Sequence, residues 1–396
     1  MTNGFTCVKK VFRYKLRPSK LHRERLDNSL NLCRHLYNGC LEHRRMLYRG
    51  WNAPVSKYDQ IKQLPELKAE FTEYRDVYSQ VLQNVVDRAD KTFQAFFRRV
   101  KHGEKPGYPR FKGANRYHSI CYPQSGFRIE GNHVVISKIG TVKMVYHREI
   151  PRSANIKSMT LKRDMVGDWF VSFMVELPDL DLPRKPGVVG IDLGIRKLAT
   201  LSDGTYYENP RWLSRTEHEI KHAQRMVARK TKGSNNRRKA VVKLAKKYRK
   251  LKRQRLDYLH KVSRQLADRF GTIAFEDLTI KNMLKNHRLA KHIADGSWDK
   301  LIQLTTYKAE EAGGCVVTVD PRNTSQECSG CGKLVRKSLV VVTHRCRHCG
   351  RAVDRDLNAA YNILSRALKS IGQGMPEFTP AETGAAARSG LTVCVV

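Results

Sequence analysis

Long apolar runs are missing from this 396-residue chain. No stretch reaches the roughly 18 consecutive apolar residues that a membrane-spanning helix needs. The first residues also lack a charged segment followed by a long apolar one, so a secretion signal is not expected. The sequence therefore predicts a protein with no membrane partner that stays inside the cell.

Acidic residues are few beside the basic ones. The chain has 37 Asp+Glu against 75 Lys+Arg, which gives a formal net charge of +38. Such an excess calls for a polyanionic partner, and nucleic acid is the natural candidate because each phosphate contact releases counterions and adds affinity. On charge alone, a ribosomal-type or simply soluble basic protein stays an alternative.

Cysteine pairs are missing from most of the chain. Six of the ten cysteines follow no pairing pattern, which is typical of reduced thiols that serve as small core residues. These six are Cys7, Cys33, Cys40, Cys121, Cys315 and Cys394.

The other four cysteines form two C-x-x-C pairs, each followed by a glycine that tolerates a tight turn. The pairs are Cys328–Cys331 and Cys346–Cys349, with 14 residues between them. Four thiolates at this spacing predict one structural zinc ion. A pair of redox dithiols is the weaker alternative, because neither pair opens a βαβ unit.

The predicted zinc site would stiffen a short insert rich in basic residues that faces nucleic acid. We expect His344 and His348, which lie within it, at its surface rather than among the zinc ligands. The basic residues are Lys333, Arg336, Lys337, Arg345, Arg347 and Arg351.

The rest of the chain alternates between strand and helix patterns, which predicts a multidomain protein with α+β and α/β parts. The predicted strands are 5–16, 127–137 as a hairpin about Gly131-Asn132, 169–177, 188–192, 197–206 as a second hairpin, 272–276 and 315–319. The predicted helices are 21–49, 79–101, the very basic 210–270 with a break near 232–236, 298–312 and 356–369. Residues 371–396 are expected to be disordered, because small and polar residues predominate there.

Three acidic residues stand at the ends of apolar strands or the start of a helix. Asp192 follows Val-Val-Gly-Ile, Glu276 follows Thr-Ile-Ala-Phe, and Asp356 opens the last predicted helix. A lone buried carboxylate costs roughly several kcal/mol unless it has a strong partner, and a divalent cation is one such partner. We expect the three acids to share a magnesium site of the kind that holds two ions about 3.5–4 Å apart for phosphodiester hydrolysis.

Each acid taken alone has an ordinary explanation: Asp192 in a turn, Glu276 in a salt bridge and Asp356 as a helix N-cap. Against this, Asn358 and Asn362 lie four residues apart in the same predicted helix. Asparagine is a poor helix former, so the two amides indicate polar contacts near a shared site.

Two neighbouring acids are alternatives at this site. Asp354 can take the place of Asp356, and Asp277 that of Glu276. The helical phase favours Asp356, but the sequence alone leaves the choice open.

Longer motifs surround these residues. In the C-terminal half they are Gly190-Ile-Asp-Leu-Gly-Ile195, Phe275-Glu-Asp-Leu278, Ser297-Trp298, Tyr307-Lys-Ala-Glu310, Gly313-Gly314, Asn323-Thr-Ser-Gln-Glu-Cys-Ser-Gly-Cys-Gly332 and Asp354-Arg-Asp-Leu-Asn-Ala-Ala-Tyr-Asn-Ile363. In the N-terminal half they are Tyr14-Lys-Leu-Arg-Pro18, Cys33-Arg-His-Leu-Tyr-Asn38, Phe96-Phe-Arg-Arg99 and Gly107-Tyr-Pro-Arg-Phe-Lys112. Over residues 5 to about 370 the chain closely resembles the TnpB (OrfB) family, transposon-encoded RNA-guided nucleases that resemble the compact type V CRISPR effectors.

The resemblance implies a wedge β-barrel with an inserted helical recognition lobe, then a RuvC-like nuclease domain of the RNase H fold with a zinc-ribbon insertion. The implied boundaries are 1–16 and 106–185 for the wedge, 17–105 for the recognition lobe, 186–320 and 351–370 for the nuclease domain, and 321–350 for the zinc ribbon, which would bind target nucleic acid. No family motif maps onto 371–396.

The resemblance also implies an activity: cleavage of double-stranded DNA beside a short target-adjacent motif, directed by a guide RNA from the transposon end, with one protein per RNA. The implied cofactors are two Mg²⁺ (or Mn²⁺) ions and one structural Zn²⁺. The family's catalytic acids fall on Asp192, Glu276 and Asp356, and none is replaced, unlike in nuclease-dead derivatives that act as guided repressors. The implied location is the prokaryotic cytoplasm, on the nucleoid when DNA is bound.

Two further groups of residues are predicted to contact nucleic acid. Gln83 and Asn84 match family positions that face the target duplex, where such amides suit adenine edges; an ordinary helix surface is the alternative. Basic residues of the stretch 210–270 would meet phosphates of the guide–target heteroduplex, unless they are simply a solvated charged face. They are Arg237, Arg238, Lys243, Lys246, Lys247, Arg249 and Lys250.

Two other functions stay open at this point. One is a non-cutting, RNA-guided DNA-binding regulator of transposition that keeps the fold. The other is a DNA-joining transposase on the same RNase H-like fold.

Overall fold

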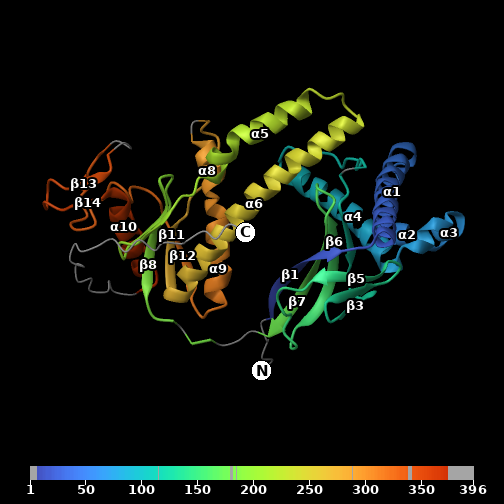
Figure 1. Ribbon diagram of the computed structural model, residues 1–396, viewed down its shortest axis with the longest axis horizontal. Helices are drawn as coiled ribbons and strands as arrows, with labels where there is room; N and C mark the ends of the chain where they lie inside the picture. Colours follow the sequence, from blue (N-terminus) through green and yellow to red (C-terminus); the bar gives the residue numbers. More distant parts are fainter. Residues whose placement is uncertain are drawn as a thin grey trace. The chain divides into compact units, whose positions relative to one another are not determined.

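The computed structural model describes residues 7–114, 116–178, 182–183, 185–287, 289–337 and 341–372 (Figure 1). Contacts between residues divide the chain into two compact units, residues 1–180 and 181–396. The predicted disordered segment lies outside the described residues from 373 onward. None of the described helices is long and apolar enough to span a membrane.

The first unit is built on an antiparallel sheet of seven strands in the order β2-β6-β7-β1-β5-β4-β3. The long first strand lies at the centre and pairs with β7 on one side and β5 on the other. The strands are β1 (Cys7–Arg17), β2 (Ser119–Tyr122), β3 (Phe127–Glu130), β4 (His133–Ile136), β5 (Gly140–Val145), β6 (Asn155–Arg163) and β7 (Trp169–Pro178).

This sheet curls strongly upon itself. Phe127 of β3 and Phe173 of β7 have ring centroids 6.0 Å apart, although three strands lie between β3 and β7. In a flat sheet, four strand spacings of about 4.8 Å would separate them by about 19 Å. The sheet is therefore rolled around a shared apolar interior, as a barrel-like wedge requires.

Helices are inserted between β1 and β2. They are α1 (Lys20–Trp51), α2 (Lys57–Lys62), α3 (Leu64–Glu70), the 3-10 helix η1 (Thr72–Asp76) and α4 (Ser79–Lys101). The two long helices confirm the predictions for 21–49 and 79–101, and their apolar faces pack together through residues such as Leu30, Leu82 and Val86. The short elements between Lys57 and Asp76 were not predicted, because one or two turns are too short to show helical periodicity.

The second unit contains a five-stranded sheet in the order β10-β9-β8-β11-β12. Its strands are β8 (Val188–Asp192), β9 (Lys197–Leu201), β10 (Tyr206–Glu208), β11 (Thr272–Glu276) and β12 (Cys315–Val319). The last two run parallel to β8, whereas β9 pairs with β8 and β10 with β9 in antiparallel fashion. These strands match the predicted ones, and their mixed pairing makes this unit the α/β part of the protein.

Helices cover both faces of this sheet. On one face, Val189, Ile191 and Phe275 share a core with residues of α6 (Asn235–Arg269) and α9 (Trp298–Glu310). On the other face, Ala274 and Val319 pack against α10 (Arg355–Ser370). The remaining elements of this unit are α5 (Trp212–Ala228), α7 (Ile280–Met283), α8 (Ala290–Gly296), β13 (Thr343–Arg345) and β14 (Ala352–Asp354).

The basic stretch 210–270 forms two helices, as predicted. Between α5 and α6 the chain turns at residues 229–234, and Ser234 caps α6 by accepting a hydrogen bond from the Arg237 amide. A serine at this position satisfies one of the free amides at the start of a helix. The predicted break near 232–236 is therefore confirmed.

Candidate functional site

The side-chain alternation of two parallel strands places two of the predicted acids on one face of the sheet. In β8, Val189 and Ile191 point to the core under α6 and α9, so Asp192 points to the opposite face. In β11, Phe275 points to that same core, and Glu276 points away from it. Phe275 pairs with Ile191, so the two acids occupy the next position along adjacent strands.

Helix α10 crosses the same face at very close range. A Cβ atom built on Gly190 would lie 2.2 Å from the Ala360 carbonyl oxygen and 2.6 Å from the Leu364 amide nitrogen. Only glycine leaves room for two backbones this close together. This close approach directs the first turn of α10, with Asp356, toward the end of β8 that carries Asp192.

The structure distinguishes Asp354 from Asp356. Asp354 is the N-cap of α10: its Oδ1 accepts hydrogen bonds from the amides of Asp356 (2.8 Å) and Leu357 (3.3 Å), and its Oδ2 lies 3.4 Å from Lys197 Nζ. Asp356 lies in the first turn, and its Oδ1 accepts from the Arg355 guanidinium at 2.9 and 3.1 Å. The carboxylate of Asp354 thus serves the helix end, whereas Asp356 pairs with Arg355, and Asp356 stays the predicted ligand of a cation.

The carboxyl groups influence one another electrostatically. Burial raises the pKa of Asp192 well above its usual value, and the neighbouring carboxylates of Glu276 and Asp356 raise it further, while the Arg355 charge acts in the opposite direction. Burial also raises the pKa of Glu276, against the hydrogen bond from Thr324 and the Arg366 charge. A buried site of like charges is stabilised by a cation.

Glu276 is held by a polar network that leads to α10. Its side chain is 7% exposed, and Oε1 accepts a hydrogen bond from the Thr324 hydroxyl. Asn362 Nδ2 in turn donates to the Thr324 carbonyl at 2.8 Å. Asn358 holds the same loop by donating to the Glu327 carbonyl (2.7 Å) and accepting from the Ser329 amide (3.0 Å). The two helical asparagines therefore bind the segment beside the acidic site, whereas the alternative acid Asp277 is exposed.

The donor set fits a hard divalent cation. It consists of carboxylate oxygens on rigid elements, which Mg²⁺ prefers, and like charges that repel one another in its absence. Among the described residues, the only group with three or more ligand atoms all within 4.8 Å of one another is the cysteine cluster. The oxygens of the three carboxylates therefore do not all lie within 4.8 Å of one another.

The four predicted zinc ligands come together. Their Sγ atoms all lie within 4.8 Å of one another, with Cys328–Cys349 and Cys331–Cys346 each at 3.6 Å. Tetrahedral Zn–S bonds of about 2.3 Å place sulfur atoms about 3.8 Å apart, so the cluster has the dimensions of a four-thiolate zinc site.

Each cysteine pair forms a turn of the same type. The Gly332 amide donates to the Cys328 carbonyl at 2.8 Å, and the Gly350 amide donates to the Cys346 carbonyl at 3.0 Å. Both glycines have φ near +70°, the region that a side chain disfavours. The second turn joins β13 to β14, and β14 runs directly into the N-cap of α10. A zinc ion here would therefore also fix the start of the helix that carries Asp356.

The surface prediction is wrong for His344. Its side chain is fully buried, and Nδ1 contacts Lys337 Nζ. The residue lies in β13, where it faces inward, and the one-letter pattern of this short strand is too brief to reveal that face. His348 is exposed, as expected.

The predicted phosphate contacts on α6 have different surroundings. Four are exposed (Arg238, Lys243, Lys246 and Lys250) and three are half-buried (Arg237, Lys247 and Arg249). Arg237 donates to the carbonyls of Val227 (3.0 Å) and Lys230 (3.1 Å), and so closes the end of α5. Lys247 pairs with Glu219 at 2.6 Å. The exposed lysines are therefore better placed for phosphates than these two residues.

The two candidate base contacts of the first unit lie next to each other in α4. Gln83 is exposed and Asn84 is half-buried. Neither side chain makes a hydrogen bond with another described residue, so both amides are available to a partner.

Comparisons with known proteins place the chain in a family. Residues 172–287 match the OrfB model of the IS605 type, described as "Probable transposase", and residues 298–363 match the TNB domain of Cas12f1-like proteins. A protein of Streptomyces pristinaespiralis, named "Putative RNA-guided DNA endonuclease", is 33% identical over 385 residues, which cover 95% of this chain and 94% of that protein. The chain belongs to the OrfB (TnpB) family.

A second relative and one solved structure are also similar to this chain. The Escherichia coli K12 protein named "Putative RNA-guided DNA endonuclease InsQ" is 29% identical, with 90% of this chain and 91% of that protein covered. The structure of a Cas12f1–sgRNA–target DNA complex aligns with a TM-score of 0.56 at 13% identity, covering 90% of this chain and 98% of that one. The predicted fold class of wedge, inserted helical lobe and RuvC-like domain with a zinc ribbon is thereby confirmed.

Three residues of this OrfB-family site escaped the sequence reasoning. Gly190 and Thr324 stand inside two of the family motifs. No signal in the neighbouring sequence shows that Gly190 makes room for α10 or that Thr324 donates a hydrogen bond to Glu276. Arg355 also stands inside a motif, and its pairing with Asp356 depends on the turn that starts α10.

Proposed function

We propose that this protein is an RNA-guided, divalent-metal-dependent endonuclease that cleaves double-stranded DNA next to a short target-adjacent motif, using a guide RNA from the transposon end. The observation that supports it best is the meeting of Asp192 and Glu276 at the ends of adjacent parallel strands, on the sheet face that α10 crosses with Asp356. The names of the relatives supply the class of reaction.

Asp192, Glu276 and Asp356 would hold two Mg²⁺ or Mn²⁺ ions. When bound, such ions activate water and stabilise the leaving oxygen in phosphodiester hydrolysis. The chain's own residues prepare the site: Thr324 orients Glu276, and Asp354 caps α10 so that Asp356 projects from a fixed first turn.

The remaining roles follow the same proposal. The wedge (1–16 and 106–185) and the recognition lobe (17–105) hold RNA and read the flanking duplex, with Gln83 and Asn84 at base edges. The RuvC-like domain (186–320 and 351–370) cuts, the zinc ribbon (321–350) holds one Zn²⁺ and contacts target nucleic acid, and base pairing reads the sequence. One protein would act per RNA, in the prokaryotic cytoplasm and on the nucleoid.

The test uses protein co-expressed with the native downstream flank of its gene. We expect a discrete flank-derived RNA to co-purify, and the complex to cut a matched plasmid only with Mg²⁺. Asp192→Ala should abolish cleavage and leave RNA and target binding intact. The matched control is Asp257→Ala, which removes an exposed carboxylate of α6 whose ion pair with Lys261 contributes little to stability.

Three outcomes separate the alternatives. Target binding without cleavage by the wild type would support the non-cutting regulator instead. Joined DNA products in a strand-transfer assay would support a transposase. Equal cleavage by the wild type and Asp192→Ala would show that the acidic site takes no part in the reaction.

A further inference from the structure

Two quoted motifs of the first unit play no part in the proposed cleavage, and the structure brings them together. The motif at 33–38 lies in α1, and the motif at 107–112 forms an extended segment that follows α4. Asn38 joins them through a two-point contact, since Nδ2 donates to the Lys112 carbonyl at 3.0 Å and Oδ1 accepts from the Lys112 amide at 2.8 Å. This contact fixes the extended segment against α1.

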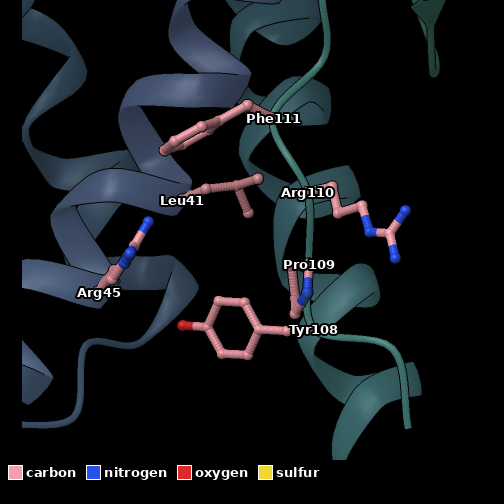
Figure 2. Close-up of a pocket in the computed structure, with 6 residues that line it drawn as sticks. All are labelled: Leu41, Arg45, Tyr108, Pro109, Arg110 and Phe111. Carbon is pink, nitrogen blue, oxygen red and sulfur yellow. The ribbon is translucent and has the colours of Figure 1, made fainter.

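A cavity of about 270 Å³ opens between α1 and this segment (Figure 2). Tyr108 and Phe111 extend from the segment toward α1, and Leu41 and Arg45 line the cavity from the helix. The volume lies just below the roughly 300–1,000 Å³ of typical small-molecule sites, so it suits a group the size of a single base.

The two aromatic rings are exposed but held in place. Tyr108 is 50% exposed and Phe111 49%. The Tyr108 ring contacts Phe93 and Phe96 of α4 in edge-to-face geometry, with centroids 6.0 and 5.4 Å away. Half of the Tyr108 side chain stays exposed despite these contacts, and an exposed aromatic ring can stack on any nucleobase.

The charged residues of the cavity are both arginines. Arg45 lines the cavity on the side of α1, whereas Arg110 points away from α1, to the other side of the extended segment (Figure 2). Neither guanidinium makes a hydrogen bond or ion pair with another described residue. Free guanidinium groups beside an aromatic cavity complement the phosphates on either side of one base.

We propose that this cavity binds one unpaired nucleotide of the guide RNA, with its base against Tyr108 and Phe111 and its phosphates near Arg45 and Arg110. The inference rests on the proposed function for the presence of that RNA. Single-stranded loops and bulges of RNA offer unstacked bases, whereas a base of the target duplex would first have to leave its pair at a cost of a few kcal/mol. RNA is therefore the better occupant.

The direct test is ultraviolet cross-linking of the complex with its co-purified RNA, followed by trypsin digestion and mass spectrometry. Trypsin does not cut before Pro106, so Tyr108 falls in the peptide 102–110. We expect a ribonucleotide adduct on this peptide. A deoxynucleotide adduct that forms only after target DNA is added would overturn the assignment to RNA.

Affinity for the RNA recovered from the wild type gives an independent measure. Tyr108→Leu and Phe111→Leu keep apolar bulk but remove the stacking face, and each should weaken RNA binding by about 5- to 150-fold. Arg45→Gln changes a residue on the surface of α1. It should lower the slope of log affinity against log salt by about one. Tyr58→Leu is the control, because this tyrosine of α2 is 64% exposed and does not line the cavity.

The failures of the two proposals can be told apart. If the wild type carries a discrete RNA and cuts DNA, but peptide 102–110 has no adduct and all three variants bind RNA as the wild type does, only the nucleotide site is refuted. If no discrete RNA co-purifies with the wild type, the guided function itself fails.

Discussion

Replacing Gly190 by alanine tests how the acidic site is assembled. The added Cβ would lie 2.2 Å from the Ala360 carbonyl oxygen, where an ordinary carbon–oxygen contact is roughly 3.3 Å. The Leu364 amide nitrogen would lie 2.6 Å away. Both atoms belong to the backbone of α10, so rotating a side chain cannot relieve the clash. The helix must therefore move by about 1 Å or the strand must bend.

Two quantities should change together. Overpacking of this kind costs about 1–3 kcal/mol, and we expect the upper end because two backbone groups clash. The shift also displaces Asp356 from Asp192, and a misplacement of about 1 Å at a catalytic group costs about 100-fold in rate. Urea denaturation of the purified protein measures the first effect, and Mg²⁺-dependent cleavage of a matched plasmid measures the second.

The same substitution at Gly39 provides the control. This glycine lies on the exposed side of α1, and a Cβ there meets nothing within 4 Å. Gly39→Ala should stabilise the protein by about 0.5–1 kcal/mol, because alanine is the better helix former. If Gly190→Ala unfolds at the wild-type urea concentration and cuts at the wild-type rate, α10 does not lie against β8 as described.

Three further predictions concern the cations and the nucleic acid. Burial and the neighbouring carboxylates raise the pKa of Asp192, so the folded metal-free protein holds the Asp192 proton more tightly than the unfolded chain does. The stability of the protein in EDTA should therefore fall as the pH rises from the usual carboxyl range through the raised pKa. Asp192→Asn should make this fall smaller. Over the same window Mg²⁺ binding should strengthen, adding about 2.7 kcal/mol of stability at a hundredfold excess over Kd. Cys346→Ser should remove the one bound zinc, measured by metal analysis, and increase hydrogen exchange in 321–337 and 341–354. Replacing Lys243, Lys246 and Lys250 together by glutamine should lower the salt slope of RNA–DNA binding by about three.

Each of these predictions has a control and a contrary result. For the pH dependence, Asp257→Asn should leave the profile unchanged, and a wild-type profile that is already flat in EDTA would contradict the raised pKa. For the zinc site, Cys315→Ser should keep the metal; a full zinc content in Cys346→Ser would exclude the four-thiolate site. For the basic helix α6, an unchanged salt slope in the triple variant would show that these three lysines are solvated and contact no phosphates.

Much of the local structure was predictable. Helical spacing located α1, α4, α9 and α10 to within a few residues, and apolar runs located β8, β11 and β12. The zinc cysteines were recognisable because a four-thiolate site is encoded by two short spacings. The roles of the acids, the nucleic-acid contacts and the domain boundaries stay predictions that the experiments above address.

Side-chain partners were less accessible. Arg237 is one basic residue among many in the sequence, yet its guanidinium closes the end of α5, because the chain turns back between α5 and α6. The inward position of His344 depends on the pairing of β13 with β14. Both arrangements depend on how separate elements pack together. The periodicity of a single helix or strand therefore could not predict them.

Three groups of candidate residues could be recognised from the sequence alone: three carboxylates at element ends, four thiolates in two turns and a large excess of basic residues. Those features depend on residue type and near neighbours, which a one-dimensional pattern records. The tertiary structure was needed to show that Asp192 and Glu276 share a face, that Asp354 caps α10 while Asp356 pairs with Arg355, and that Gly190 admits α10. These outcomes depend on the register of strands about 80 residues apart and on how closely a helix crosses them, and such distances are set by packing rather than by any local sequence signal.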